Sequence, residues 1–160
     1  MKISFSSLCA LPVLVLAVAC GDTDPNPIAT VASFAPETLD PSDDTADDLT
    51  IRVDYADGDG DLGEGIAEVY DCRVSNLVLR FDLPKIASEE AVAEGVPIEG
   101  SLDIVVADVS DLTPDSSVPP TCAELGVSAM SAGQAVFCVL LVDVAGNSGD
   151  GDCTGTVAIE

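Results

Sequence analysis

The chain has 160 residues, 48% of them hydrophobic, which is enough to build the core of one folded domain. Its formal net charge is −24 at pH 7, and the basic residues after the N-terminal segment are only Arg52, Arg73, Arg80 and Lys85. Nucleic-acid binding is excluded because it needs clustered Lys and Arg, and an anionic lipid surface repels such a chain, whereas cations are attracted. The absence of His excludes Ser-His and Cys-His catalytic pairs, so we expect a protein that is not an enzyme.

The N-terminal segment has the layout of a signal peptide. Lys2 provides the positive n-region, residues 8–19 form the apolar h-region, and the small residues 17–19 precede Cys20. The Ala-Val-Ala-Cys run resembles the lipobox of bacterial lipoproteins, in which the cysteine thiol is acylated and becomes part of the first mature residue. Ordinary secretory cleavage at the same bond is an alternative. A transmembrane anchor is disfavoured because Pro12 interrupts a stretch shorter than the roughly 20 residues that a bilayer needs.

The lipobox resemblance implies a division of the chain into three parts: a signal peptide over residues 1–19, a lipidated cysteine with a polar tether over 20–27, and a folded domain over 28–160. It also implies that the membrane contact is a lipid anchor of the palmitate type in the bacterial cell envelope. Gly21 rather than Asp after the cysteine favours the outer membrane. The acidic stretch 37–48 is either a loop between the first two strands, which we favour, or an extension of the tether.

Beyond the tether, apolar residues recur with a period of two, which is typical of half-buried strands. The stretch 136–142 is apolar on both faces, as expected of a central strand. Only residues 88–94 have a helical pattern. The predicted strands, in chain order, are 28–34, 49–55, 66–71, 77–83, 102–106, 136–142 and 153–159.

About seven short strands separated by Gly, Pro and Asp turns predict an all-β protein, an antiparallel β-sandwich, with a small closed barrel as the alternative. Residues 143–147 (DVAGN) resemble the D-x-A-G-N turn of bacterial Ig-like surface domains. Residues 55–63 (YADGDGDLG) resemble Asp-rich turns in Ig-like domains of bacterial surface lipoproteins. The resemblance implies an Ig-like sandwich used for surface display, adhesion or a Ca²⁺-stiffened structure.

The run Asp57-Gly-Asp59-Gly-Asp61 is the first candidate metal site, because Ca²⁺ prefers several carboxylate oxygens and glycine lets the backbone fold around the ion. In the spacing of an EF-hand loop, Glu68 falls at the twelfth position and completes a possible Ca²⁺ ligand set. Leu62 replaces the glycine that the EF-hand turn needs, and strands rather than helices flank the loop. We therefore expect either an irregular Ca²⁺ loop or a solvated Asp-Gly turn.

A second acidic loop, over residues 143–152, carries oxygen ligands on Asp143, Asn147, Asp150 and Asp152. D-x-A-G-N turns take part in Ca²⁺ sites in some bacterial Ig-like repeats, which is what the resemblance implies here. A glycine-rich hairpin loop without an ion is the alternative, and we favour it.

Four cysteines remain for disulfides if Cys20 is lipidated, and export favours their oxidation. They permit three pairings. Because Cys138 and Cys153 flank a glycine-rich turn on neighbouring predicted strands, we favour Cys138–Cys153, which leaves Cys72–Cys122.

These expectations describe a lipid-anchored envelope protein with a structural or protein-binding Ig-like domain. A Ca²⁺-dependent adhesion module and an accessory subunit of an envelope complex, with another envelope protein as partner, are the alternatives. Acidic side chains gathered around one ion would favour the Ca²⁺ hypothesis, and an exposed apolar strand edge would favour a protein partner.

Overall fold

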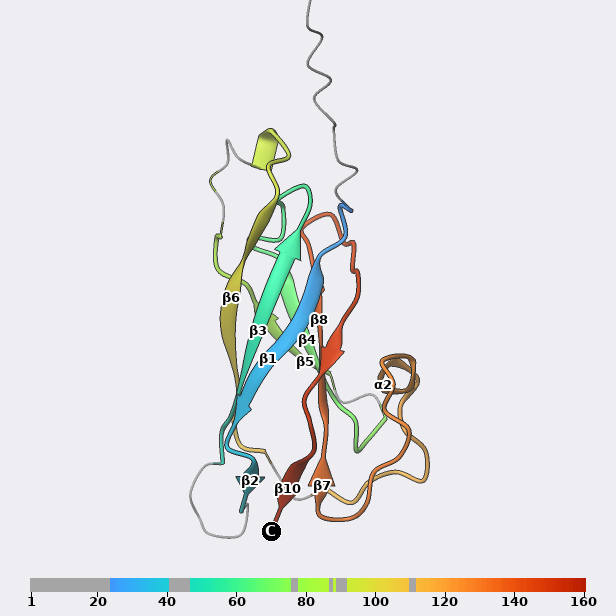
Figure 1. Ribbon diagram of the computed structural model, residues 1–160. Helices are drawn as coiled ribbons and strands as arrows, with labels where there is room; N and C mark the ends of the chain where they lie inside the picture. The colour runs from blue at the N-terminus through green and yellow to red at the C-terminus, as the bar shows by residue number, and fades with distance from the viewer. Residues whose placement is uncertain (1–23, 41–46, 76–77, 87, 89–91, 110–111) are drawn as a thin grey trace, which may run out of the picture.

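Two antiparallel sheets face each other across the main hydrophobic core (Figure 1). The first sheet has the order β1-β3-β6, with β1 at Ile28–Ala35, β3 at Leu49–Asp57 and β6 at Ile98–Val106. The second has the order β5-β4-β8-β9, with β5 at Val78–Asp82, β4 at Ile66–Asp71, β8 at Phe137–Val142 and β9 at Asp152–Cys153. A third, small sheet contains β2 at Thr38–Leu39, β10 at Val157–Ile159 and β7 at Gln134–Ala135.

The computed structural model describes residues 24–40, 47–75, 78–86, 88, 92–109 and 112–160. The predicted signal peptide, Cys20 and residues 89–91 of the helix expected over 88–94 lie outside these residues, while 92–93 are helical and Val92 N–H donates to the Ser88 carbonyl at 3.0 Å. Of the predicted tether, the described part ends in a buried Pro27, whose carbonyl accepts a hydrogen bond from Gly149 N–H at 3.1 Å. The folded part of the chain thus begins at the edge of the tether.

Strand β3 shows why the sequence pattern produces a sandwich. Leu49, Ile51 and Val53 are fully buried and alternate with the exposed Arg52 and Asp54. Because a strand places successive side chains on opposite faces, one face of β3 lies in the core and the other in solvent. Truncating a buried Leu or Ile of this kind to Ala costs about 2–5 kcal/mol. The predicted all-β sandwich is confirmed.

The second sheet is built around β4 and β8. Ile66 of β4 pairs with Val142 of β8, and the register continues without a break to Asp71 and Phe137. Most of β8 is buried, as its uniformly apolar sequence predicts for a central strand. Phe137, Val139 and Leu141 of β8 therefore pack in the main core, and Cys138 packs in a second cluster on the outer face of the sheet.

The C-terminal stretch 153–159 was predicted as one strand, and this is wrong. It divides into β9 and β10, which belong to different sheets. Between them Thr154 exchanges hydrogen bonds with Phe137: the Thr154 hydroxyl oxygen accepts from Phe137 N–H at 3.0 Å, and Thr154 N–H donates to the Phe137 carbonyl at 2.9 Å. The chain leaves the second sheet after this exchange.

A short helix, α2 at Pro120–Glu124, lies to one side of the second sheet (Figure 1), and its buried Cys122 packs with Cys138 of β8. The sequence pattern did not predict it. Its Cys122 is bonded to Cys72, and Cys138 is bonded to Cys153, so both predicted disulfides are confirmed. The two bridges lie side by side in a small second core, with 3.3 Å between the sulfurs of Cys72 and Cys138.

Candidate cation site

The candidate site begins where β3 ends. Asp57, the last residue of β3, has the same alternation phase as Ile51 and Val53, so its carboxylate faces inward and is only 2% exposed. One carboxylate oxygen of Asp57 accepts a hydrogen bond from Leu62 N–H at 2.8 Å. Leu62 itself is fully buried, which anchors the turn to the core. The residue that departs from the EF-hand pattern is thus the one that holds this turn closed.

Three carboxylates converge in the turn. One oxygen from each of Asp57, Asp59 and Asp61 lies within 4.8 Å of the other two. Two oxygens that share a Ca²⁺ ion at about 2.3–2.6 Å each lie at most about 5.2 Å apart, so this spacing fits a common ion. The structure brings together three of the four residues predicted for the first site.

The same three side chains carry polar atoms without a partner. The Oδ1 atoms of Asp57, Asp59 and Asp61 are shielded from solvent and have no hydrogen-bond partner in the part of the chain that the structure describes. A buried charged oxygen without a partner costs free energy, because it loses water and gains nothing in return. The three arginines form ion pairs elsewhere, with Asp103, Asp71 and Glu68.

The electrostatics of the turn favour an added positive charge. Burial and, after it, the negative charges of Asp143, Asp59 and Asp57 together raise the pKa of Asp61 to about 6. Burial also raises the pKa of Asp57, against the Leu62 hydrogen bond that lowers it. At pH 7 these carboxylates carry charge in a place that disfavours it, and a divalent cation would remove that penalty.

Asp143, from the second predicted loop, lies beside the first. Its charge acts on both Asp57 and Asp61, and Val144 N–H donates to the Asp61 carbonyl at 3.4 Å. Gly65 permits this approach, because a Cβ at that position would lie 2.2 Å from the Val142 carbonyl oxygen. The two acidic loops, predicted as separate candidates, therefore share one end of the sandwich.

Asn147 holds Asp143 in place. Its backbone N–H donates to one carboxylate oxygen at 2.7 Å, and its side-chain amide donates to the other at 2.8 Å. The D-x-A-G-N turn thus orients a buried carboxylate toward the first loop. Asp143 is 4% exposed.

The inclusion of Glu68 was wrong. Glu68 belongs to the opposite phase of β4 from the buried Ala67 and Val69, so it faces outward. Its carboxylate binds the cross-strand Arg80 at 2.8 Å and accepts the Tyr70 hydroxyl at 2.6 Å. The EF-hand spacing that suggested Glu68 ignores this strand phase.

Asp150 and Asp152 also lie apart from the three carboxylates. Asp152 accepts hydrogen bonds from the backbone N–H groups of Val31 and Cys153, both at 2.8–2.9 Å. The Asp150 carbonyl accepts from Ala29 N–H at 2.9 Å. These contacts join β1 to the chain around β9, so the second loop does not form an ion site of its own from the predicted residues.

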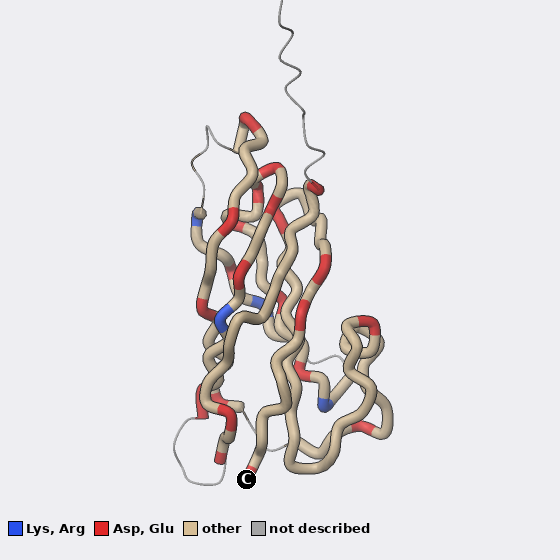
Figure 2. The backbone as a smooth tube through the Cα atoms, in the orientation of Figure 1, with Lys and Arg blue, Asp and Glu red and all other residues tan. Residues whose placement is uncertain are grey.

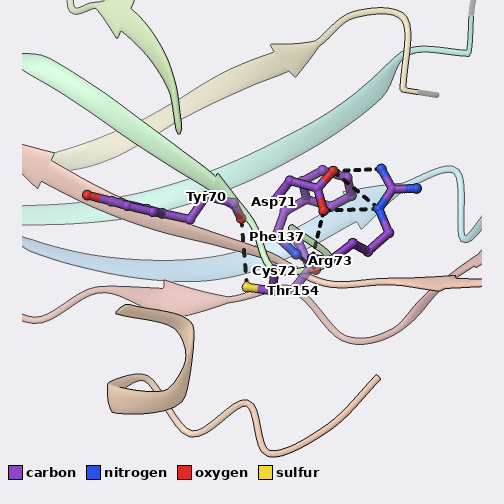
Figure 3. Close-up of polar contacts among 6 residues, drawn as sticks. All are labelled: Tyr70, Asp71, Cys72, Arg73, Phe137 and Thr154. Atoms are coloured by element: carbon purple, nitrogen blue, oxygen red, sulfur yellow. Dashed lines mark hydrogen bonds and ion pairs between the residues drawn. The ribbon is translucent and has the colours of Figure 1, made fainter. Parts of the chain in front are cut away.

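A third buried aspartate, Asp71, which the sequence did not single out, has a structural role (Figure 3). The Asp71 carboxylate binds the Arg73 guanidinium at 2.6 Å, with both side chains less than 5% exposed. The guanidinium also lies over the Phe137 ring, 5.9 Å from its centre. The only sequence signal for this ion pair was the Asp-Cys-Arg run over residues 71–73, at the end of a predicted strand, and it is weak.

No protein family matches the chain, and neither a curated protein nor a solved structure is similar enough to it to count as a match. Within the described residues, no helix has both the length and the apolar character needed to cross a membrane.

Proposed function

We propose that this protein is a lipid-anchored component of the bacterial envelope whose β-sandwich binds Ca²⁺ through Asp57, Asp59 and Asp61, with Asp143 adding negative charge beside them. The lipid anchor rests on the lipobox over residues 17–20, and the envelope location rests on the same segment. Two disulfides fit an oxidising compartment outside the cytoplasm. The bound ion would join the β3–β4 turn to the turn after β8 and stiffen that end of the domain.

Two observations on the same three aspartates carry the proposal: each has a shielded Oδ1 atom without a partner, and one carboxylate oxygen of each lies within 4.8 Å of the other two, a spacing that one ion can bridge. A plain solvated turn would leave these oxygens in water, where repulsion between them is screened. A hydrogen-bonded structural turn would give each oxygen a donor. Neither alternative accounts for all three atoms.

The ligand chemistry favours Ca²⁺ among common cations. All candidate ligands are hard carboxylate oxygens, and the cysteines of the domain are engaged in disulfides. Backbone carbonyls of the glycine-rich turn and water would supply the remaining oxygens of a shell of six to eight.

A protein-binding role has less support from the strand edges. Strand β6 pairs only with β3 within the described residues, so one edge is open. Its exposed side chains include Glu99 and Asp103, and charges of this kind oppose pairing with another strand. Val105 is the one large apolar residue among the exposed β6 side chains, so this edge is mainly charged and gives a protein partner less support than the carboxylates give an ion.

Isothermal titration calorimetry tests the proposal. We expect CaCl₂ to bind the purified protein with one site, and Asp59→Asn to weaken binding at least tenfold, because it removes a charged ligand from the set. Glu124→Gln, which removes an exposed charge from α2, is the matched control and should bind like the wild type. Absence of binding heat in the wild type, or equal affinity in Asp59→Asn, would contradict the proposal.

A further inference from the structure

We propose that the end of the sandwich that carries the candidate Ca²⁺ site faces the membrane and, when the ion is bound, rests on anionic phospholipid headgroups. We call this end the acidic end; it comprises residues 24–28, 57–65, 92–98 and 143–149. The inference rests on the proposed function, since it needs both the lipid anchor and the ion. It assigns a partner, an anionic lipid surface, to the same site.

The path of the chain places the acidic end near the anchor. The first described residue, Asp24, lies at this end together with Ile28 and Asp57, and these residues line one cavity of about 360 Å³. The C-terminus lies at the opposite end (Figure 1). The chain from Cys20 to Asp24 spans at most about 14 Å even when fully extended. A lipid on Cys20 would therefore hold the acidic end within that reach of the headgroups.

Exposed apolar side chains gather at the same end. Five large hydrophobic residues are exposed in the described part of the chain, and Val105 is the one that lies on the side of the sandwich, in β6. The other four surround the acidic residues: Ile28, Val92, Val96 and Val144. Val144 is 63% exposed, and it lines a second cavity, of about 380 Å³, together with Asp61 and Val92.

The local backbone fixes these apolar residues around the acidic turn. Gly60 adopts a φ of +77°, and a Cβ there would lie 2.2 Å from the Val96 carbonyl oxygen, so the turn and the segment before β6 touch through their backbones. Val144 N–H donates to the Asp61 carbonyl. Val96 and Val144 are therefore held by their backbones against the turn that carries the carboxylates.

Charge makes the contact with lipid conditional on the ion. Figure 2 shows acidic residues spread along the fold with few basic ones among them, so an anionic membrane repels the ion-free domain. Ca²⁺ between the carboxylates offsets two of their negative charges, which lowers the repulsion at this end, and lipid phosphate oxygens would replace water in the coordination positions that the protein leaves open. The exposed valines can then enter the interfacial layer, where apolar surface is removed from water.

Neutron reflectometry on the purified lipoprotein in supported bilayers tests this arrangement. The measured quantity is the thickness of the water layer between the headgroups and the protein, with Ca²⁺ or with a chelator at matched ionic strength. On phosphatidylcholine mixed with phosphatidylglycerol, we expect a layer of up to about 14 Å in chelator and its loss in Ca²⁺. On phosphatidylcholine alone, we expect Ca²⁺ to leave the layer unchanged.

Two matched variants separate the apolar contact from ion binding. Val144→Ser should bind Ca²⁺ like the wild type in calorimetry but retain the water layer in Ca²⁺. Val105→Ser makes the same substitution at another exposed valine, which lies on the side of the sandwich, and it should behave like the wild type in both measurements.

The outcomes distinguish the two proposals. Calorimetric binding of Ca²⁺ combined with an unchanged water layer would overturn the membrane contact and leave the Ca²⁺ site standing. Equal behaviour of Val144→Ser and Val105→Ser, or equal loss of the layer on neutral lipid, would also overturn it. Absence of Ca²⁺ binding in calorimetry would contradict the proposed function itself.

Discussion

Two aspartates in this domain occupy equivalent places and have opposite surroundings. Asp57 is the last residue of β3 and Asp71 the last residue of β4, and both continue the inward phase of their strand. They are 2% and 3% exposed. Asp71 has the guanidinium of Arg73 on both carboxylate oxygens, whereas Asp57 has one backbone N–H on one oxygen.

A buried carboxylate can be neutralised by the chain itself or by a bound ion. The chain itself supplies the partner of Asp71, the guanidinium of Arg73, so this buried charge is already paired in the folded protein. Asp57 is surrounded by Asp59, Asp61 and Asp143, and its Oδ1 atom has no partner among the described residues, which is why we propose a bound ion as its partner. The same inward-facing carboxylate is therefore part of the structure in one case and part of a candidate site in the other.

The largest loss of stability is expected when the Asp71–Arg73 ion pair is broken. Arg73→Leu should destabilise the protein by about 3–5 kcal/mol, because it leaves the Asp71 charge buried without its counter-ion. Urea unfolding measures this change. Arg52→Leu is the control: its ion pair with Asp103 is half exposed, and its loss should cost less than about 1 kcal/mol. Similar costs for the two variants would contradict the structural role of Arg73.

The two disulfides should contribute different amounts to the free energy of unfolding. The Cys72–Cys122 bridge closes a separation of 50 residues and the Cys138–Cys153 bridge one of 15. Replacing both cysteines of a bridge by Ala should cost about 4 kcal/mol for the first and about 3 kcal/mol for the second in the chain-entropy comparison. Urea unfolding of the two double variants checks the order, and a larger loss for the shorter loop would contradict it.

At the acidic end, protons should compete with the ion. The pKa of Asp61 is raised to about 6, so below that pH the group binds a proton that Ca²⁺ must displace. We expect Ca²⁺ affinity to be roughly tenfold weaker at pH 5 than at pH 7, because one group titrates over that interval. Calorimetry at both pH values measures this ratio. An affinity that is independent of pH over this range would contradict a role for Asp61 as a ligand.

Raising the pH should strengthen Ca²⁺ binding, but without Ca²⁺ the raised pKa of Asp61 should make the folded protein less stable as the pH rises. Because Asp61 binds its proton more tightly in the folded state than in the unfolded state, the protonated form favours folding. We expect the stability of the Ca²⁺-free protein to fall as pH rises from about 4 through about 6, and Asp61→Asn to flatten that slope. Urea unfolding in chelator, across this pH range, measures the slope. A rising stability that Asp61→Asn leaves unchanged would contradict the account.

The fold followed from the sequence where side-chain alternation was regular. Leu49, Ile51 and Val53 predicted β3, and the uniformly apolar 136–142 predicted the central β8. The division between β9 and β10 was not predictable, because it depends on a hydrogen-bond exchange between Thr154 and Phe137 across the sheet. Helix α2 was missed because it has only five residues, and because its position depends on the disulfide between Cys122 and Cys72.

The candidate site was partly predictable for the same reason. Asp57, Asp59 and Asp61 are neighbours in the chain, so local spacing was enough to group them. Asp143 joined them through the pairing of Ile66 with Val142, which sequence alone does not specify. Glu68 was included by loop spacing, and strand phase excludes it.

The most direct test of the account compares two salts in unfolding of the intact protein at pH 7. CaCl₂ at about 100 times its Kd should raise the free energy of unfolding by about 2.7 kcal/mol if it binds only the folded state. NaCl at matched ionic strength screens surface repulsion alone and should give much less. Asp59→Asn should lose most of the difference between the salts. Equal stabilisation by CaCl₂ and NaCl in the wild type would contradict the Ca²⁺ site.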